Sequence, residues 1–81
     1  MSTRAIIEQQ FRLVAGDQEK ALARLTDDLV LLDCGLDSLC FAIIVSRLEN
    51  VLGLDPFSKN EDAPFPVNLR EFIRFYENAA Q

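Results

Sequence analysis

Apolar side chains recur at steps of three and four residues along much of the chain, which is the spacing of one face of an α-helix. The clearest stretch ends before Gly53, which supplies a helix stop that Pro56 reinforces. We therefore predict a helix from about Ser38 to Leu52. Its predicted apolar face consists of Phe41, Ile44, Val45, Leu48 and Leu52.

Two further helices are predicted, one before and one after this stretch. The first begins near Ser2 or Thr3, either of which can cap it, and the last begins at Asn68, with Glu71 placed for a capping box. Residues 18–25 have good helical propensity, and the pattern leaves open whether they continue the first helix past Gly16 or form a separate turn. The two predicted apolar stripes are Ile6, Ile7, Phe11 and Val14, and Leu69, Phe72, Ile73 and Tyr76.

The connections between these helices contain apolar residues of their own. Residues 29–32 would form a buried strand if taken alone, but no second strand pattern exists to pair with them, so we interpret them as a loop anchored to the core through its leucines. Two prolines exclude a regular helix before Asn68, although a short helical turn near Glu61 is allowed. Phe57 and Phe65 are predicted as core residues, with the lining of a groove as the alternative.

Length and composition narrow the range of functions. The 81 residues predict a single domain, residues 1–81, with a thin core. The net charge of −5 argues against nucleic acid and membrane surfaces and favours basic protein partners. The chain has no histidine, the commonest general base and metal ligand, which argues against a hydrolase or a metalloenzyme, and we expect no metal site. No apolar run has transmembrane length and the N-terminal residues lack a signal-peptide core, so we expect a cytoplasmic protein with no membrane insertion.

The predicted solvent side of the 38–52 helix suggests a partner contact with an apolar centre. Cys40, Ile43 and Arg47 lie on that side, and we expect them to contact partner proteins. For Ile43, packing against the preceding loop is the alternative. Cys34 and Cys40 do not form a metal or redox motif, so we predict free, partly buried thiols, with an exposed Cys40 thiol as the alternative.

The residues just before this helix carry the candidate chemistry. Asp37 and Ser38 are both good N-cap residues, and Gly35 allows a tight turn that a side chain would obstruct. That turn would present Ser38 at the tip of a loop. The positive end of the helix dipole, with its unpaired N–H groups, favours a phosphate at this position. An Asp-Ser pair before a helix is most often only a cap, so the wider motif has to decide.

Residues 35–39, Gly-Leu-Asp-Ser-Leu, lie mid-chain in a small acidic helical domain and resemble the attachment motif of acyl and peptidyl carrier proteins. The resemblance covers nearly the whole chain. It implies an all-α fold: a small four-helix bundle with a long loop between helices 1 and 2 and a short or irregular third helix. It also implies a covalent 4′-phosphopantetheine on Ser38, with Asp37 helping to position the modifying synthase and Leu39 completing the motif.

A carrier of this kind would be a discrete, monomeric protein that bears acyl or aminoacyl intermediates as thioesters. The resemblance implies three kinds of partner: a phosphopantetheinyl transferase, an acyl- or aminoacyl-loading enzyme, and a downstream synthase or transferase. The solvent side of the 38–52 helix has Glu49 as its only acid, unlike the acid-rich second helix of carriers of bacterial fatty acid synthesis, which favours a specialised polyketide, nonribosomal peptide, aminoacyl or lipid-modifying pathway. The alternative is a helical interaction module in which Ser38 is only an N-cap. A serine hydrolase lacks the histidine base it would need.

Overall fold

The computed structural model describes residues 2–59 and 65–79, and within these the chain is all-helical without a β-strand. The predicted all-α class is therefore confirmed. The long helices among the described residues are α1 (Thr3–Asp17), α2 (Ser38–Leu52) and α4 (Leu69–Ala79). A single four-residue turn, α3 (Pro56–Lys59), and a 3₁₀ turn, η1 (Leu31–Asp33), complete the described elements. The helical turn expected near Glu61 lies outside the described residues.

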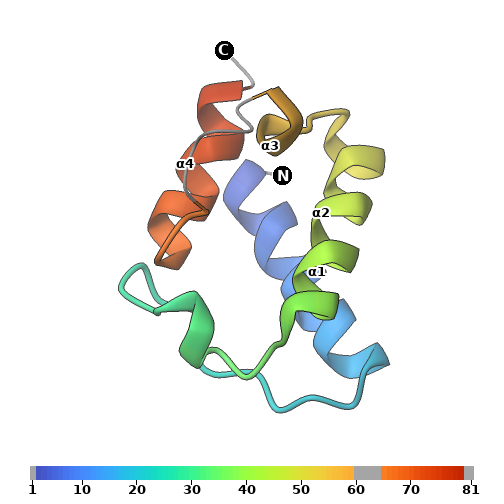
Figure 1. Ribbon diagram of the computed structural model, residues 1–81, viewed down its shortest axis with the longest axis vertical. Coiled ribbons are helices and arrows are strands. Elements are labelled where there is room, and N and C mark those ends of the chain that lie inside the picture. The colour runs from blue at the N-terminus through green and yellow to red at the C-terminus, as the bar shows by residue number, and fades with distance from the viewer. Residues whose placement is uncertain (1, 60–64, 80–81) are drawn as a thin grey trace.

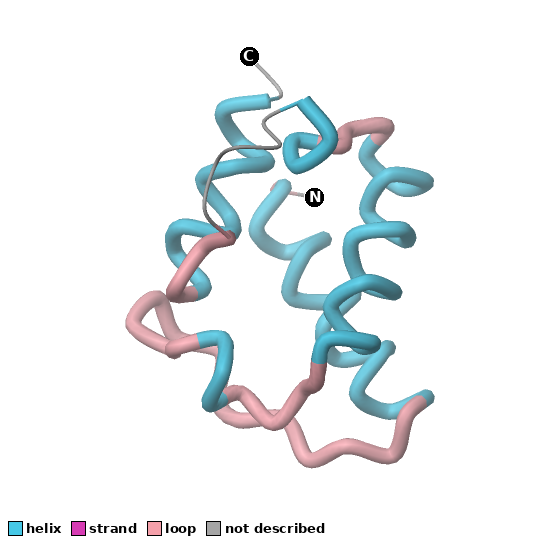
Figure 2. Tube along the Cα trace, in the orientation of Figure 1, coloured by secondary structure: helices cyan, strands magenta, loops and turns pink. Residues whose placement is uncertain are grey.

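The long helices pack side by side around one core (Figure 1). Helix α1 contacts both α2 and α4, and α3 packs on α4 near one end of the molecule. The connection between α1 and α2 crosses the opposite end, where Figure 2 shows it as a long loop interrupted only by η1. The predicted long loop before α2 is thus present, and it leads directly into the turn that carries Ser38.

Residues 18–25 do not continue α1, which settles the question that the sequence left open. The helix ends at Asp17, residues 18 and 19 turn, and the chain then runs without regular structure. Instead of bonding within a helix, the backbone N–H of Ala23 donates to the carbonyl of Cys34 at 2.9 Å. Helical propensity in this segment is overridden by a tertiary contact with the turn before α2.

The predicted limits of the other helices agree with the structure. Gly53 ends α2 in the left-handed conformation, and its N–H donates to the carbonyl of Glu49 at 2.8 Å. At the start of α4, the Asn68 side chain accepts from the Glu71 N–H at 2.9 Å. The Glu71 carboxylate accepts from the N–H of Val67, one residue before the position that a capping box would use.

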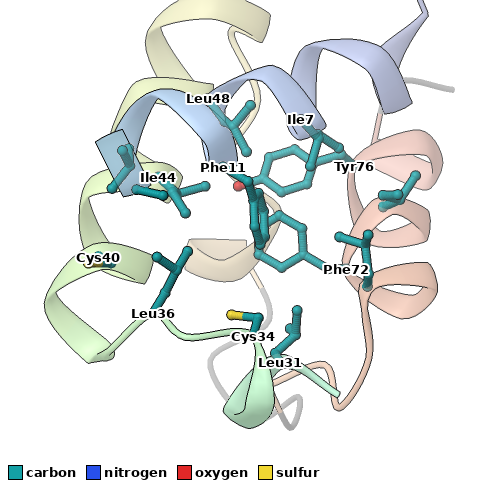
Figure 3. Packing of buried hydrophobic residues seen from close by; sticks show 14 residues of the cluster. Ile7, Phe11, Leu31, Cys34, Leu36, Cys40, Ile44, Leu48, Phe72 and Tyr76 are labelled. Atoms are coloured by element: carbon teal, nitrogen blue, oxygen red, sulfur yellow. The ribbon is translucent and has the colours of Figure 1, made fainter. Parts of the chain in front are cut away.

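The core forms where the three long helices meet the connection before α2 (Figure 3). The ring of Phe11 lies at its centre, with ring centroids 5.4 Å from Phe72 and 6.0 Å from Phe41. The predicted stripes supply most of the buried side chains, and Cys34 and Cys40 are both fully buried free thiols. The buried apolar residues of the long helices are Ile7, Phe11, Val14, Ala15, Cys40, Ile44, Leu48, Leu69, Phe72, Ile73 and Tyr76.

Residues 29–32 anchor the connection only in part as predicted. Leu31 is buried and Leu29 packs against the core, but Leu32 is 89% exposed, so the prediction is wrong for Leu32. The backbone explains why Leu32 is exposed while Leu31 is buried, because residues 29–32 do pair with another segment. Val30 forms an isolated antiparallel bridge with Asn68, and the 3₁₀ turn η1 that follows, with about three residues per turn, points Leu31 and Leu32 in different directions.

Ion pairs fix the same connection to two helices. Asp27 pairs with Arg4 of α1, and Asp28 pairs with Arg70 of α4 at 3.3 Å. The N–H of Arg70 also donates to the carbonyl of Asp27 at 3.2 Å. The connection is therefore joined to both α1 and α4, so the turn that follows it has a defined position relative to the core.

Candidate functional site

The turn before α2 depends on a close backbone contact at Gly35. Its φ is 99°, a conformation that residues with a side chain rarely adopt. A Cβ at this position would lie far inside contact distance of the carbonyl oxygen of Ala21, which is backbone and cannot rotate away. Gly35 thus lets the 20–26 loop lie directly against the turn, as the sequence predicted for a tight turn.

Asp37, not Ser38, caps α2. Its backbone is extended, and its carboxylate accepts from the N–H of Cys40 at 3.0 Å. That hydrogen bond, with help from Lys20, holds the pKa of Asp37 below its ordinary value. The ammonium of Lys20 lies 3.7 Å from the same carboxylate. The cap leaves Ser38 as the first residue of the helix, free of a capping role.

Ser38 is exposed, and its hydroxyl makes no hydrogen bond to a described residue. The cap uses the N–H of Cys40, and the N–H of Phe41 donates to the carbonyl of Asp37 at 3.1 Å. The N–H groups of Ser38 and Leu39 precede the first intrahelical bond. An anionic group on the Ser38 oxygen would therefore meet two backbone donors and the positive end of the helix dipole.

A groove opens beside Ser38, with a volume of about 850 Å³. All of its lining residues except Asp37 and Ser38 are apolar. Four of the seven exposed large apolar side chains of the described residues belong to it: Val30, Leu32, Phe65 and Val67. Its other apolar residues are Leu31, Leu36, Phe41, Ala42, Val45, Phe57 and Pro66.

Three phenylalanine rings form one wall of this groove. The rings of Phe57 and Phe65 are stacked, with centroids 5.5 Å apart, and Phe41 meets the edge of Phe65 at 5.9 Å. Phe57 packs on the core, as predicted, but Phe65 is 50% exposed, so its prediction as a core residue is wrong. Both line the groove, which is the alternative that the sequence allowed.

The predicted site residues separate into two groups. Asp37, Ser38 and Leu39 lie together on the surface, where Leu39 is well exposed. The expectation that Cys40 faces solvent and contacts partners is wrong, because its side chain is only 1% exposed. The thiol points toward the core since the helix starts at Ser38 and turns the third residue inward.

Ile43 and Arg47 lie between these two extremes. Ile43 is half-buried and packs against the core, so it is less exposed than predicted, and its packing against the preceding loop stays a prediction. The guanidinium of Arg47 donates to the Gln10 side chain at 2.7 Å and lies 3.9 Å from the Asp17 carboxylate, so this residue links α2 to α1. As partner contacts, both remain predictions.

Sequence reasoning missed the exposed rim of the groove. Leu32 and Val67 are absent from every predicted site, although each is an apolar residue beside a polar one in a connection between the long helices. Lys20, the ion-pair partner of Asp37, was missed as well. The available signal for the rim was an apolar residue in a loop that cannot bury it. Where such a residue lies in space, however, depends on the backbone bridge between Val30 and Asn68.

Comparisons with known proteins give a short match to one kind of synthase. No family model matches the chain, and no solved structure matches it. Two proteins named norsolorinic acid synthase, from Dothistroma septosporum strain NZE10 and from Dothistroma septosporum, are each 39% identical over 64 residues. The aligned part is 75% of this chain but 3% of the synthase, so the chain corresponds to a small piece of it. Such a match is compatible with a carrier unit.

Two searches of the described residues bear on other functions. No helix in residues 2–59 and 65–79 is long and apolar enough to cross a membrane. The same part of the chain holds no cluster of three or more histidine, cysteine or carboxylate side chains that could bind a metal ion.

Proposed function

We propose that this chain is a carrier domain of the acyl and peptidyl carrier type, with 4′-phosphopantetheine attached to Ser38. The observation that carries the proposal is the free, exposed Ser38 hydroxyl at the start of α2, in a turn that Asp37 and Gly35 hold in place. We take residues 1–81 as one monomeric, cytoplasmic domain that performs no catalysis, with α3 as the short third helix of a four-helix carrier bundle.

The residues around Ser38 suit an attached phosphodiester. Backbone N–H groups of Ser38 and Leu39 face the start of the helix, where negative charge is stabilised. The Asp37 carboxylate adjoins the site and would repel a phosphate, but its charge is engaged by the Cys40 N–H and by Lys20. When bound, the group supplies a terminal thiol that carries an acyl or aminoacyl cargo as a thioester.

The attachment step involves a single atom of this chain. The Ser38 oxygen attacks the phosphorus of coenzyme A that bears the pantetheine, and forms a new oxygen–phosphorus bond. The bond from that phosphorus to the oxygen of the second phosphate breaks, and adenosine 3′,5′-bisphosphate leaves. The hydroxyl proton passes to a base of the transferase, because no described side chain of this protein lies in hydrogen-bond contact with the Ser38 hydroxyl.

The proposed pathway is a specialised one. The likeness to a small part of norsolorinic acid synthase supports a carrier that serves a synthase, with a phosphopantetheinyl transferase and a loading enzyme as its other partners. A flexible arm would raise the effective concentration of the cargo at each partner's active site. The apolar groove beside Ser38 also distinguishes this surface from a purely acidic one.

An interaction module without a prosthetic group is the second candidate. Its premise was that Ser38 serves only as the N-cap, but Asp37 occupies that role. The exposed apolar residues around the groove are what still favours it, since such clusters mark protein contacts.

Mass spectrometry separates the two candidates. Purified protein is incubated with a promiscuous phosphopantetheinyl transferase and coenzyme A. The wild type and Ser46→Ala, a matched change of an exposed serine in the same helix, should each gain one phosphopantetheinyl group. Ser38→Ala should gain none. An unmodified wild type, or equal modification of Ser38→Ala, would reject the carrier and leave the interaction module.

A second variant tests the role of Asp37. Asparagine caps helices about as well as aspartate, so Asp37→Asn keeps the hydrogen bond to Cys40 and removes only the charge. We expect slower modification of Ser38 with unchanged helix content by circular dichroism. Unchanged modification kinetics would restrict Asp37 to capping.

A further inference from the structure

We propose that the groove beside Ser38 holds the acyl group of the loaded carrier, and that it selects uncharged acyl groups with a planar aromatic or conjugated part. This inference rests on the proposed function. Its substance is a cargo class, which neither the attachment motif nor the likeness to a synthase supplies.

The groove is continuous with the attachment point. Ser38 lies at its mouth, and Phe41, Ala42 and Val45 follow on the same face of α2. The seven helical steps from Ser38 to Val45 correspond to about 10 Å along the axis. A cargo that folds back from a tether at Ser38 would therefore meet the apolar side of α2 without crossing another element.

Charge excludes one of the two cargo classes that the motif allows. Among the described residues, Asp37 is the only ionisable one that lines the groove, and it lies next to Ser38 at the mouth, where the Cys40 N–H and Lys20 already engage it. An aminoacyl cargo carries an ammonium group next to its thioester carbonyl. Buried among the apolar residues, that ammonium would lose its hydration without gaining a partner. An uncharged acyl group has no such cost.

The shape of the wall favours flat groups over flexible ones. Phe65 has one face stacked on Phe57 and is half exposed, and Phe41 presents its ring across the edge of Phe65. Aromatic rings gain from offset stacked and edge-to-face contacts beyond their buried area. A rigid planar group also loses little conformational freedom on binding, whereas a saturated chain must order each of its bonds.

The volume admits such a group. An apolar cavity of about 150 Å³ holds one benzene molecule. The groove, at about 850 Å³, therefore has room for more than one ring, and it falls within the range of pockets that bind small molecules. The small Ala42 side chain leaves the space beside the phenylalanine wall open.

The test loads three cargoes and measures how well each is shielded. Cinnamoyl-, nonanoyl- and alanyl-phosphopantetheine are transferred to Ser38 from their coenzyme A thioesters, with release of adenosine 3′,5′-bisphosphate, and mass spectrometry verifies loading. Hydroxylamine then attacks each thioester carbonyl, forming the hydroxamate and releasing the thiol. The cleavage rate of the same thioester in coenzyme A, divided by the rate on the protein, gives a protection factor free of intrinsic reactivity.

We expect protection to fall in the order cinnamoyl, nonanoyl, alanyl, although cinnamoyl and nonanoyl have the same number of carbon atoms. Cinnamoyl should exceed nonanoyl by about threefold, a size typical of added aromatic contacts, and alanyl should be unprotected. Equal protection of cinnamoyl and nonanoyl would overturn the aromatic preference. Equal protection of all three, or of none, would remove the groove as a cargo site. Failure to load at all would instead reject the proposed function.

Two variants connect the result to the groove. Phe65→Leu keeps an apolar side chain but removes the ring, so it should abolish the advantage of cinnamoyl over nonanoyl and keep the advantage of both over alanyl. Val51→Ala, an exposed position of α2 that does not line the groove, is the control and should change neither. Circular dichroism checks that both variants fold. A loss of preference in Val51→Ala, or its persistence in Phe65→Leu, would contradict the assignment.

Discussion

The core and the groove are built from the same residue types, but only one of them is closed. Phe11, Ile44 and Phe72 are completely buried where the long helices meet, whereas Leu32, Phe65 and Val67 are at least half exposed around Ser38. Burial of an apolar side chain stabilises a fold, and a side chain that stays exposed contributes little of this free energy. These exposed groove residues therefore contribute little to folding, and their clustering beside one serine indicates a binding role.

Helix α2 belongs to both regions. Ile44 and Leu48 point into the core, while Phe41 and Val45 from the same predicted face are half-buried and line the groove. A helix that needed only a core contact would require a narrower stripe. The width of the apolar face is thus the link between the stable side of the molecule and its open side.

The largest predicted effect breaks the core. Phe11→Ala removes a fully buried ring between α2 and α4, and such changes cost about 3–5 kcal/mol. Domains of this size have a total stability of about 4–12 kcal/mol, so the variant should be marginally folded in urea titrations followed by circular dichroism.

The matched change in the groove is Phe65→Ala. Its ring is already half exposed, so we expect a loss of only about 1 kcal/mol in the same titration. Equal losses at Phe11 and Phe65 would mean that the groove is a second part of the folding core, and the contrast between the two regions would disappear.

The next effect concerns the turn between the regions. Gly35→Ala forces a side chain into a φ of 99° and against the Ala21 carbonyl, so the loop at residues 20–26 must move. We expect a loss of about 1–3 kcal/mol in unfolding free energy, together with slower modification of Ser38.

Gly16→Ala is the control for this change. Gly16 lies in α1 with nothing within 4 Å of an added Cβ, so alanine there should be neutral or stabilising by up to about 1 kcal/mol. If Gly35→Ala and Gly16→Ala changed the unfolding free energy equally, the close backbone contact at Gly35 would not contribute to stability.

The sequence predicts the fold well where periodicity and capping act locally. The limits of α2 and α4 follow from Asp37, Gly53 and Asn68, and the apolar stripes of the helices supply the core. Prediction was incomplete at residues 18–25, where a hydrogen bond from the Ala23 N–H to the Cys34 carbonyl, a tertiary contact that helical propensity does not describe, decides the conformation.

The candidate site was predicted in its chemistry but not in its surroundings. The residue types at Asp37 and Ser38 and the spacing from Gly35 identify the exposed turn. Whether Leu32 faces water depends on the bridge at Val30, which joins distant segments, whereas the burial of Cys40 follows from the start of α2 at Ser38, which the sequence predicted. The groove arises from contacts between distant segments, so no local pattern contained it.

A smaller effect is expected from an imperfection of the core. The hydroxyl of Tyr76 is buried without a hydrogen-bond partner among the described residues, and burial raises its pKa above the ordinary value. Tyr76→Phe removes the unpaired group and keeps the ring, so unfolding free energy should stay the same or rise by about 1 kcal/mol. A loss of stability would show that the hydroxyl has a partner in solution.

The same residue gives a pH dependence with a definite sign. Above pH of about 10 the phenol of the unfolded chain ionises while the buried one stays protonated, so the folded state binds more protons. The contribution of Tyr76 to the unfolding free energy is therefore fully present below a pH of about 10 and is lost as the pH rises further. Because the chain has one tyrosine and no tryptophan, phenolate absorbance follows this residue alone. Phenolate appearing at the ordinary pKa in folded protein would contradict the burial.

The smallest expected change in stability is at Leu32, and it gives the sharpest comparison of core and groove, because one variant separates stability from cargo binding. Leu32 is 89% exposed at the rim of the groove, so Leu32→Ser should change unfolding free energy by no more than about 0.5 kcal/mol. If the groove holds the cargo, the same variant should lower the protection of a cinnamoyl thioester on Ser38. Leu13→Ser, an exposed leucine of α1 outside the groove, should leave both quantities unchanged. A lower unfolding free energy in Leu32→Ser would mean that this side chain belongs to the core. Full protection of the cinnamoyl thioester in the same variant would mean that the exposed Leu32 has no role in holding the cargo.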